Sequence, residues 1–111
     1  MSNNICVIGA GYWGKNHIRT LDELGALGGI VEPNSGLLNR FSKKYPNILL
    51  YNNLTDALKN DSFSGFIVAV PADAHFQVAE KIIQSKKHLL VEKPLTLNIQ
   101  DAEKLVIMAN E

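Results

Sequence analysis

The fold of this chain is decided by residues 5–14, Ile-Cys-Val-Ile-Gly-Ala-Gly-Tyr-Trp-Gly. The run from Ile5 to Ile8 is apolar and rich in β-branched residues, and Gly9 ends it, which predicts a strand buried on both faces. From Tyr12 to Leu24, apolar side chains recur at roughly helical spacing, and Gly25 supplies a stop signal. Residues 5–14 are therefore the junction between a buried strand and a helix.

This junction contains a complete G-x-G-x-x-G pattern at Gly9, Gly11 and Gly14. We expect Gly9 to allow the tight turn, Gly11 to let the main chain approach a diphosphate, and Gly14 to let the helix pack on the strand. Amides at the start of a helix have no partner within it, so an anion there gains hydrogen bonds and the favourable end of the helix dipole. The pattern predicts a dinucleotide-binding loop.

Two large residues inside the loop, Tyr12 and Trp13, are candidate cofactor-binding residues. Packing on the domain is the alternative for both, and it is the better explanation for Trp13. For Tyr12, covering the cofactor phosphates and packing on the domain stay equally open.

An acidic residue, Glu32, ends a second predicted strand at 29–32. A carboxylate there accepts hydrogen bonds from the adenosine ribose of NAD and repels a 2′-phosphate, which favours NAD(H) over NADP(H). The alternative is a solvated residue at a strand end, because Pro33 and Asn34 form a turn that needs polar residues in any case.

The rest of the chain repeats this alternation of short apolar strands and amphipathic helices. Further strands are predicted at 48–51, 66–70 and 88–91, and further helices at 36–45, 55–58, 72–85 and after a cap at Thr96 or Asn98. Apolar strands too short to alternate, each followed by a helix, are typical of a parallel sheet covered on both faces. The predicted fold class is α/β, a doubly wound parallel sheet of the Rossmann type, in one domain over residues 1–111.

Composition and charge exclude several classes of protein. Eleven Lys and Arg balance eleven Asp and Glu, which disfavours a non-specific nucleic-acid or anionic-membrane binder. No apolar run approaches the roughly 20 residues of a membrane span. The single cysteine, Cys6, excludes an internal disulfide and a cysteine-cluster metal site, and we predict no metal. Residues 1–4 lack the basic region of a signal peptide, so we expect a cytoplasmic protein.

Two more loops follow predicted strands, at the sheet edge where ligands of α/β folds bind. One is the P-x-x-x-H segment from Pro71 to His75, and the other is Glu92-Lys93-Pro94. With the glycine loop, these motifs resemble the glucose-fructose oxidoreductase / inositol dehydrogenase / MocA-like (Gfo/Idh/MocA) family, and the resemblance runs over the whole chain. The form Gly-Tyr-Trp-Gly-Lys-Asn at 11–16 is most similar to members that oxidise nucleotide-linked amino sugars, such as UDP-N-acetylglucosamine 3-dehydrogenases.

The resemblance implies a role for each matching residue. NAD would be held by Gly9, Gly11, Gly14, Glu32, Pro71, His75, Glu92 and Lys93, the last of which is also the catalytic residue between nicotinamide and substrate. Hydride transfer from a secondary alcohol leaves a proton to be removed and builds charge on oxygen, which a lysine ammonium stabilises. The alternatives are a solvated strand-end lysine for Lys93 and a helix-orienting role for His75.

The chain departs from the family in length. Members carry a C-terminal domain that forms the substrate floor and the oligomer interface, and their dinucleotide domain has one more strand than is predicted here. We therefore expect a fragment that binds NAD(H) but does not turn over a sugar or nucleotide-sugar substrate. The full protein is expected to be a homo-oligomer, and the missing strand should leave a sheet edge that pairs with another chain.

Two other functions stay open beside the dehydrogenase. One is a non-catalytic dinucleotide sensor, and the weaker one is a Rossmann domain for S-adenosylmethionine. Lys93 favours the enzyme, because neither alternative needs a lysine at the reacting carbon.

Overall fold

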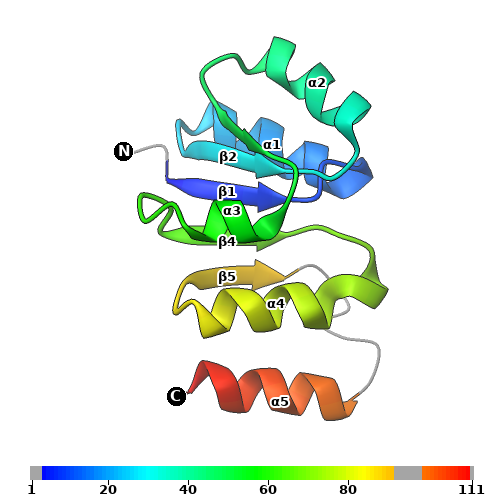
Figure 1. Ribbon diagram of the computed structural model, residues 1–111, viewed down its shortest axis with the longest axis vertical. Helices are drawn as coiled ribbons and strands as arrows, with labels where there is room; N and C mark the ends of the chain where they lie inside the picture. Colours follow the sequence, from blue (N-terminus) through cyan, green and yellow to red (C-terminus); the bar gives the residue numbers. More distant parts are fainter. Residues whose placement is uncertain (1–3, 92–98, 111) are drawn as a thin grey trace.

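The computed structural model describes residues 4–91 and 99–110. Figure 1 shows strands and helices alternating along the chain. In order they are β1 (Ile5–Ile8), α1 (Tyr12–Glu23), β2 (Leu27–Val31), α2 (Ser35–Lys44), β3 (Leu49–Tyr51), α3 (Leu54–Leu58), β4 (Gly65–Val68), the 3₁₀ helix η1 (Ala72–Ala74), α4 (His75–Gln84), β5 (His88–Val91) and α5 (Ile99–Ala109).

The strands form one parallel sheet in the order β3-β2-β1-β4-β5. From the central strand β1 the chain first builds outward through β2 and β3, and it then returns to add β4 and β5 on the other side. The strand order reverses between β1 and β4, which is the position where open α/β sheets bind ligands. The predicted fold class is confirmed.

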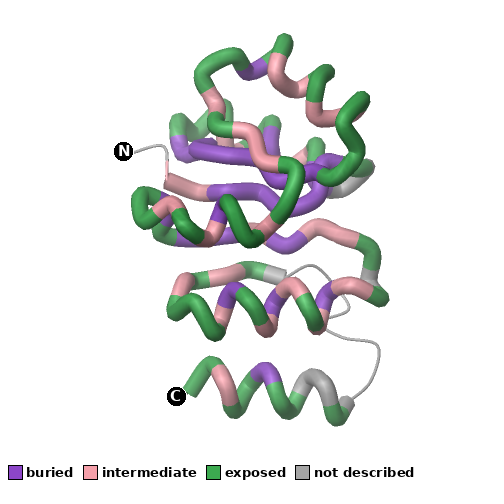
Figure 2. Tube along the Cα trace, in the orientation of Figure 1, coloured by how far each residue is buried: buried purple, intermediate pink, exposed green. Residues whose placement is uncertain are grey.

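Both faces of the sheet are covered, and each has its own core. Cys6 and Ile8 of β1 point into a cluster with Ala57 of α3 and Ile82 of α4. Val7, between them, points the other way, into a cluster that includes Ile18 of α1 and receives the apolar side of α2. Figure 2 shows the buried residues concentrated along the central strands. Alternate residues of β1 therefore serve opposite faces, which explains its continuous apolar sequence.

The helix ends follow local sequence signals. Gly25 has φ +71° and, with Ala26, closes α1: their amides donate to the carbonyls of Asp22 (3.1 Å) and Leu21 (2.9 Å). This is a Schellman motif, so the predicted stop at Gly25 is confirmed. Asn34 caps α2 by accepting the Leu37 amide at 3.0 Å, as one of the two predicted cap positions.

Most predicted boundaries agree with the structure to within one residue, and three elements differ by more. β2 begins at Leu27, whereas the sequence predicts a start at residue 29. Gly28 and Gly29 conceal the first part of the strand because glycine has a low strand propensity. The structure needs a glycine at position 29, since a Cβ there would lie 2.5 Å from the Phe63 ring. β4 spans Gly65–Val68, not 66–70, since the chain turns toward η1. The predicted helix 72–85 is divided into η1 and α4, and Ala74 donates to the Pro71 carbonyl at 2.9 Å.

Two negative findings hold for residues 4–91 and 99–110. No helix there is long and apolar enough to cross a membrane. The same part of the chain holds no group of three or more His, Cys, Asp or Glu side chains able to bind a metal ion.

Candidate functional site at the carboxyl edge of the sheet

The first and third glycines of the loop are required by packing within the chain. Gly9 has φ +97°, and a Cβ there would lie 2.8 Å from the Ala69 carbonyl oxygen at the end of β4. A Cβ at Gly14 would collide with the Gly9 carbonyl oxygen. Gly9 therefore makes the turn and Gly14 lets α1 approach it, as the sequence predicts.

Gly11 differs from both, because the space beside it is open. It precedes α1, it is exposed, and among the described residues no atom lies within 4 Å of a Cβ built there. No side chain of the described residues caps α1, and its first turn contains no acid. We call this open space beside Gly11, at the start of α1, the cradle. An anion there gains hydrogen bonds from the first amides of the helix and the favourable end of the helix dipole.

Glu32 lies beside this loop and is buried, with only 9% of its surface exposed. It directly follows β2, whose end lies next to the end of β1. Its Oε1 accepts the Ala10 amide at 2.8 Å and its Oε2 accepts the Asn34 amide at 2.9 Å. The carboxylate is therefore tied to the glycine loop and to the β2–α2 turn, so the solvated strand-end alternative is wrong.

The segment after β4 completes the part of the site that the structure describes. Gly9 packs against Ala69, which brings this segment to the glycine loop. His75, the first residue of α4, is 1% exposed, and its Nε2 lies 2.9 Å from the Val70 carbonyl oxygen. Pro71, between them, is exposed. His75 therefore orients the segment onto α4, the second of its two predicted roles, while its contact with a cofactor stays a prediction.

Four predicted site residues cannot be placed by their side chains. Tyr12 and Trp13 are the first residues of α1, and only their main chain is described. Glu92 and Lys93 lie outside the described residues, as do Pro94 and the predicted caps Thr96 and Asn98. Their roles stay predictions.

Two features of the site were missed in the sequence. The first is the pair of amides, from Ala10 and Asn34, that bind Glu32; main-chain donors leave no signature in side-chain identity. The second is a hollow of about 610 Å³ between α1 and α2 that reaches Ala10 and Gly11. Among the described residues, its lining includes four exposed cations, Lys15, Arg19, Arg40 and Lys44, and no acid. Lys15 and Arg19 of α1 are four residues apart, as are Arg40 and Lys44 of α2, and this spacing is the signal that the two side chains of each pair share a helix face.

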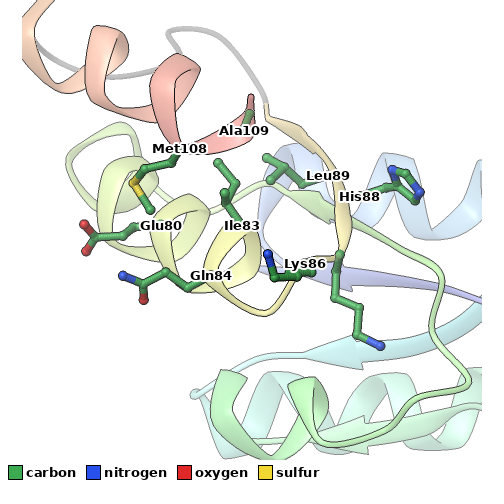
Figure 3. A pocket seen from close by; sticks show the side chains of 9 residues that line it. Glu80, Ile83, Gln84, Lys86, His88, Leu89, Met108 and Ala109 are labelled. Carbon is green, nitrogen blue, oxygen red and sulfur yellow. The ribbon is translucent and has the colours of Figure 1, made fainter. Parts of the chain in front are cut away.

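Two further features, a second hollow and the buried Cys6 thiol, are not part of this candidate site. A hollow of about 730 Å³ lies between α4, α5 and the start of β5, lined by residues that include Ile83, Leu89 and Met108 (Figure 3). It is at the amino end of β5, away from the glycine loop. Burial raises the pKa of the Cys6 thiol to about 12, so this thiol stays protonated and is a small core residue, as predicted. The pKa of Tyr45, which lines the hollow between α1 and α2, is raised by burial and, secondly, by the negative charge of Asp22.

A doubly wound parallel sheet, a glycine cradle at an uncapped helix and a buried acid after the next strand define a dinucleotide-binding Rossmann domain. The chain belongs to the Gfo/Idh/MocA family, because the family model described as "Oxidoreductase family, NAD-binding Rossmann fold" matches residues 3–111. The predicted family and the predicted cofactor, NAD, are confirmed.

Individual relatives are similar over nearly the whole chain. A UDP-N-acetylglucosamine 3-dehydrogenase from Acidithiobacillus ferrooxidans is 31% identical over 110 residues, 95% of this chain and 33% of that protein. An inositol 2-dehydrogenase from Corynebacterium glutamicum is 27% identical over 108 residues, 95% of this chain and 32% of that protein. The crystal structure of GenD2 from gentamicin A biosynthesis in complex with NAD has a TM-score of 0.90 at 26% identity, over 98% of this chain and 32% of that one. The chain thus spans about a third of the length of these relatives.

Proposed function

We propose that this chain is the NAD(H)-binding part of a dehydrogenase that takes hydride from a secondary alcohol of a sugar or nucleotide-sugar. The observation that carries the proposal is the open cradle at Gly11, before an uncapped helix and beside the buried carboxylate of Glu32. The similarity to a UDP-N-acetylglucosamine 3-dehydrogenase supports a UDP-N-acetylhexosamine-like substrate.

Each part of the site has a proposed task. The amides at the start of α1 hold the diphosphate, with Tyr12 and Trp13 beside it, and Glu32 accepts the adenosine ribose hydroxyls. The Val70–Ala74 segment, oriented by His75, and Glu92 hold the nicotinamide ribose. NAD, when bound, supplies the hydride acceptor.

Lys93 is the proposed catalytic residue. In the sequence it stands two positions after Val91, the last residue of β5, and β5 pairs with β4 in the sheet. A general base removes the hydroxyl proton, which leaves negative charge on the alcohol oxygen, and a lysine ammonium there stabilises that charge before hydride leaves the carbon. Glu32 also favours NAD(H), since a carboxylate repels the 2′-phosphate of NADP(H).

We further propose that residues 1–111 by themselves bind NAD(H) without turnover.

We also propose that the protein is cytoplasmic and that it self-associates. A single reduced cysteine is consistent with the cytoplasm. Association is supported by β5, an outer strand of the sheet on which Leu90 is 57% exposed. A monomer by light scattering at high concentration contradicts self-association, and a steady dehydrogenase rate from residues 1–111 contradicts the absence of turnover.

Calorimetry with Gly11→Val tests the proposed site. The φ of Gly11, −75°, lies outside the left-handed region that favours glycine, so a valine side chain can be placed in the open space at the start of α1. We expect the wild type to bind NADH more tightly than NADPH or S-adenosylmethionine, and Gly11→Val to weaken NADH binding at least about tenfold, roughly 1.4 kcal/mol. The control is Gly36→Val, at an exposed glycine of α2. Unchanged NADH affinity in Gly11→Val contradicts the proposal, and tighter NADPH binding contradicts the role of Glu32.

A further inference from the structure

The contacts of Glu32 go beyond those of a ribose-binding acid. One carboxylate oxygen accepts the Ala10 amide of the glycine loop, 22 residues away in sequence, and the other accepts the Asn34 amide of the β2–α2 turn. We propose that Glu32 is also the positioning residue of the diphosphate cradle, and that it couples diphosphate binding to ribose binding. This inference rests on the proposed function of the site.

The glycine loop needs such an acceptor. Ala10 is 1% exposed, so its amide has no access to bulk water, and a buried amide requires a partner. Hydrogen bonds to an ionised carboxylate are shorter and stronger than those to a neutral acceptor. Because Ala10 lies between Gly9 and Gly11, its hydrogen bond to Glu32 fixes the orientation of the loop main chain. The amides that remain for an anion are then those that follow Gly11.

The same carboxylate also reaches the next helix. Asn34 donates its amide to Glu32 and, with its side chain, accepts the Leu37 amide at the start of α2. Glu32 thereby connects the turn before α1 to the turn before α2, across two neighbouring strands. A shift of either turn displaces the carboxylate from the other.

The ribose can be bound without breaking these contacts. An ionised carboxylate has about four acceptor positions, and two are used by Ala10 and Asn34. Two positions remain for the two ribose hydroxyls. The two amides bind different carboxylate oxygens, and a glutamine has an acceptor oxygen at only one of these positions, so the amide that faces its NH₂ group loses its acceptor. The carboxylate is thus the feature that serves loop and ribose together.

The test compares two ligands that share a diphosphate, ADP and 2′,3′-dideoxy-ADP, of which the second lacks the ribose hydroxyls. Their affinities for the wild type and for Glu32→Gln are measured by calorimetry, with the exposed Glu23→Gln as the control. We expect Glu32→Gln to weaken both ligands, ADP at least tenfold and dideoxy-ADP at least threefold. Equal affinity of wild type and Glu32→Gln for dideoxy-ADP overturns the positioning role.

A second variant and a spectroscopic readout guard against misfolding. Glu32→Asp keeps the charge but shortens the side chain by one methylene, so it cannot span the two amides; it too should weaken dideoxy-ADP. In the NMR spectrum the Ala10 amide proton should move upfield and exchange faster in both variants, whereas the Gly25 amide should not move. An unaltered Ala10 amide overturns the positioning role, whereas failure of the wild type to bind NADH or ADP overturns the proposed function.

Discussion

Helices α1 and α2 begin at the same edge of the sheet, after neighbouring strands, yet they begin in opposite ways. The Asn34 side chain caps α2, and the Asn53 side chain likewise caps α3 by accepting the Asp56 amide at 2.9 Å. At α1 the position is taken by Gly11, without a side chain, and Lys15 stands early in the helix. A cap and an acid stabilise a helix start, and a cation there does not. Among the described residues, the start of α1 thus has no capping side chain and no acid, and an anion there would supply the missing stabilisation.

The largest effect is expected from the glycine that holds α1 against the loop. Gly14→Ala, a change that usually stabilises a helix, places a methyl group on the Gly9 carbonyl oxygen. We expect the free energy of unfolding to fall by about 3 kcal/mol. Denaturant unfolding measures it, with Gly11→Ala as the matched control because its methyl group meets no described atom. Equal stability of the two variants would mean that the close approach of α1 to the loop is unimportant.

A capping side chain at the start of α1, like the one at α2, should raise the free energy of unfolding and weaken NADH binding. Gly11→Asp supplies a capping carboxylate, so we expect the unfolding free energy to rise by a few tenths of a kcal/mol, roughly 0.3. The same charge repels a diphosphate, and NADH affinity should fall more than about tenfold, roughly 1.4 kcal/mol. Calorimetry and thermal melting measure the two effects. If NADH binds Gly11→Asp as tightly as the wild type, the diphosphate is held elsewhere.

Removing the cap of α2 should have the opposite pattern. Asn34→Ala deletes the acceptor for the Leu37 amide but keeps the Asn34 main-chain donor to Glu32. We expect a loss of about 1 kcal/mol in the unfolding free energy with little change in NADH affinity. Asn47→Ala, at an exposed position before β3, is the control. A loss of NADH affinity without a loss of stability would contradict the assignment of the Asn34 side chain as a helix cap only.

The smallest effect is expected from the cations between the two helices. In a formally neutral chain, Lys15, Arg19, Arg40 and Lys44 gather at one hollow beside Gly11. The double variant Arg19→Gln/Arg40→Gln should slow NADH association about threefold at low ionic strength, because clustered charge steers an anionic ligand. The difference should vanish at high salt. Stopped-flow measurements check this against Lys104→Gln on α5, and a salt-independent difference would argue against steering.

The two ends of the helices also show how much of the structure can be predicted from the sequence. Asn34 and Gly25 were predictable because capping depends on residues a few positions apart. The start of β2 was not, since Gly28 and Gly29 have low strand propensity and only the packed Phe63 ring explains them. The position of Glu32 was predictable from its place after a strand. Its contact with Ala10 was not, because the partner is an amide 22 residues away that only the parallel pairing of β1 and β2 brings near.

The sequence alone determined the order of strands and helices, the glycine loop, the acid after the second strand and the family. These features depend on periodicity and loop motifs, which neighbouring residues define. The tertiary structure decided which glycine is open and which are packed, what holds the Glu32 carboxylate, that His75 is buried against the Val70 carbonyl, and that four cations share one hollow. These features depend on distances across the sheet, and such distances exist only once distant segments have packed.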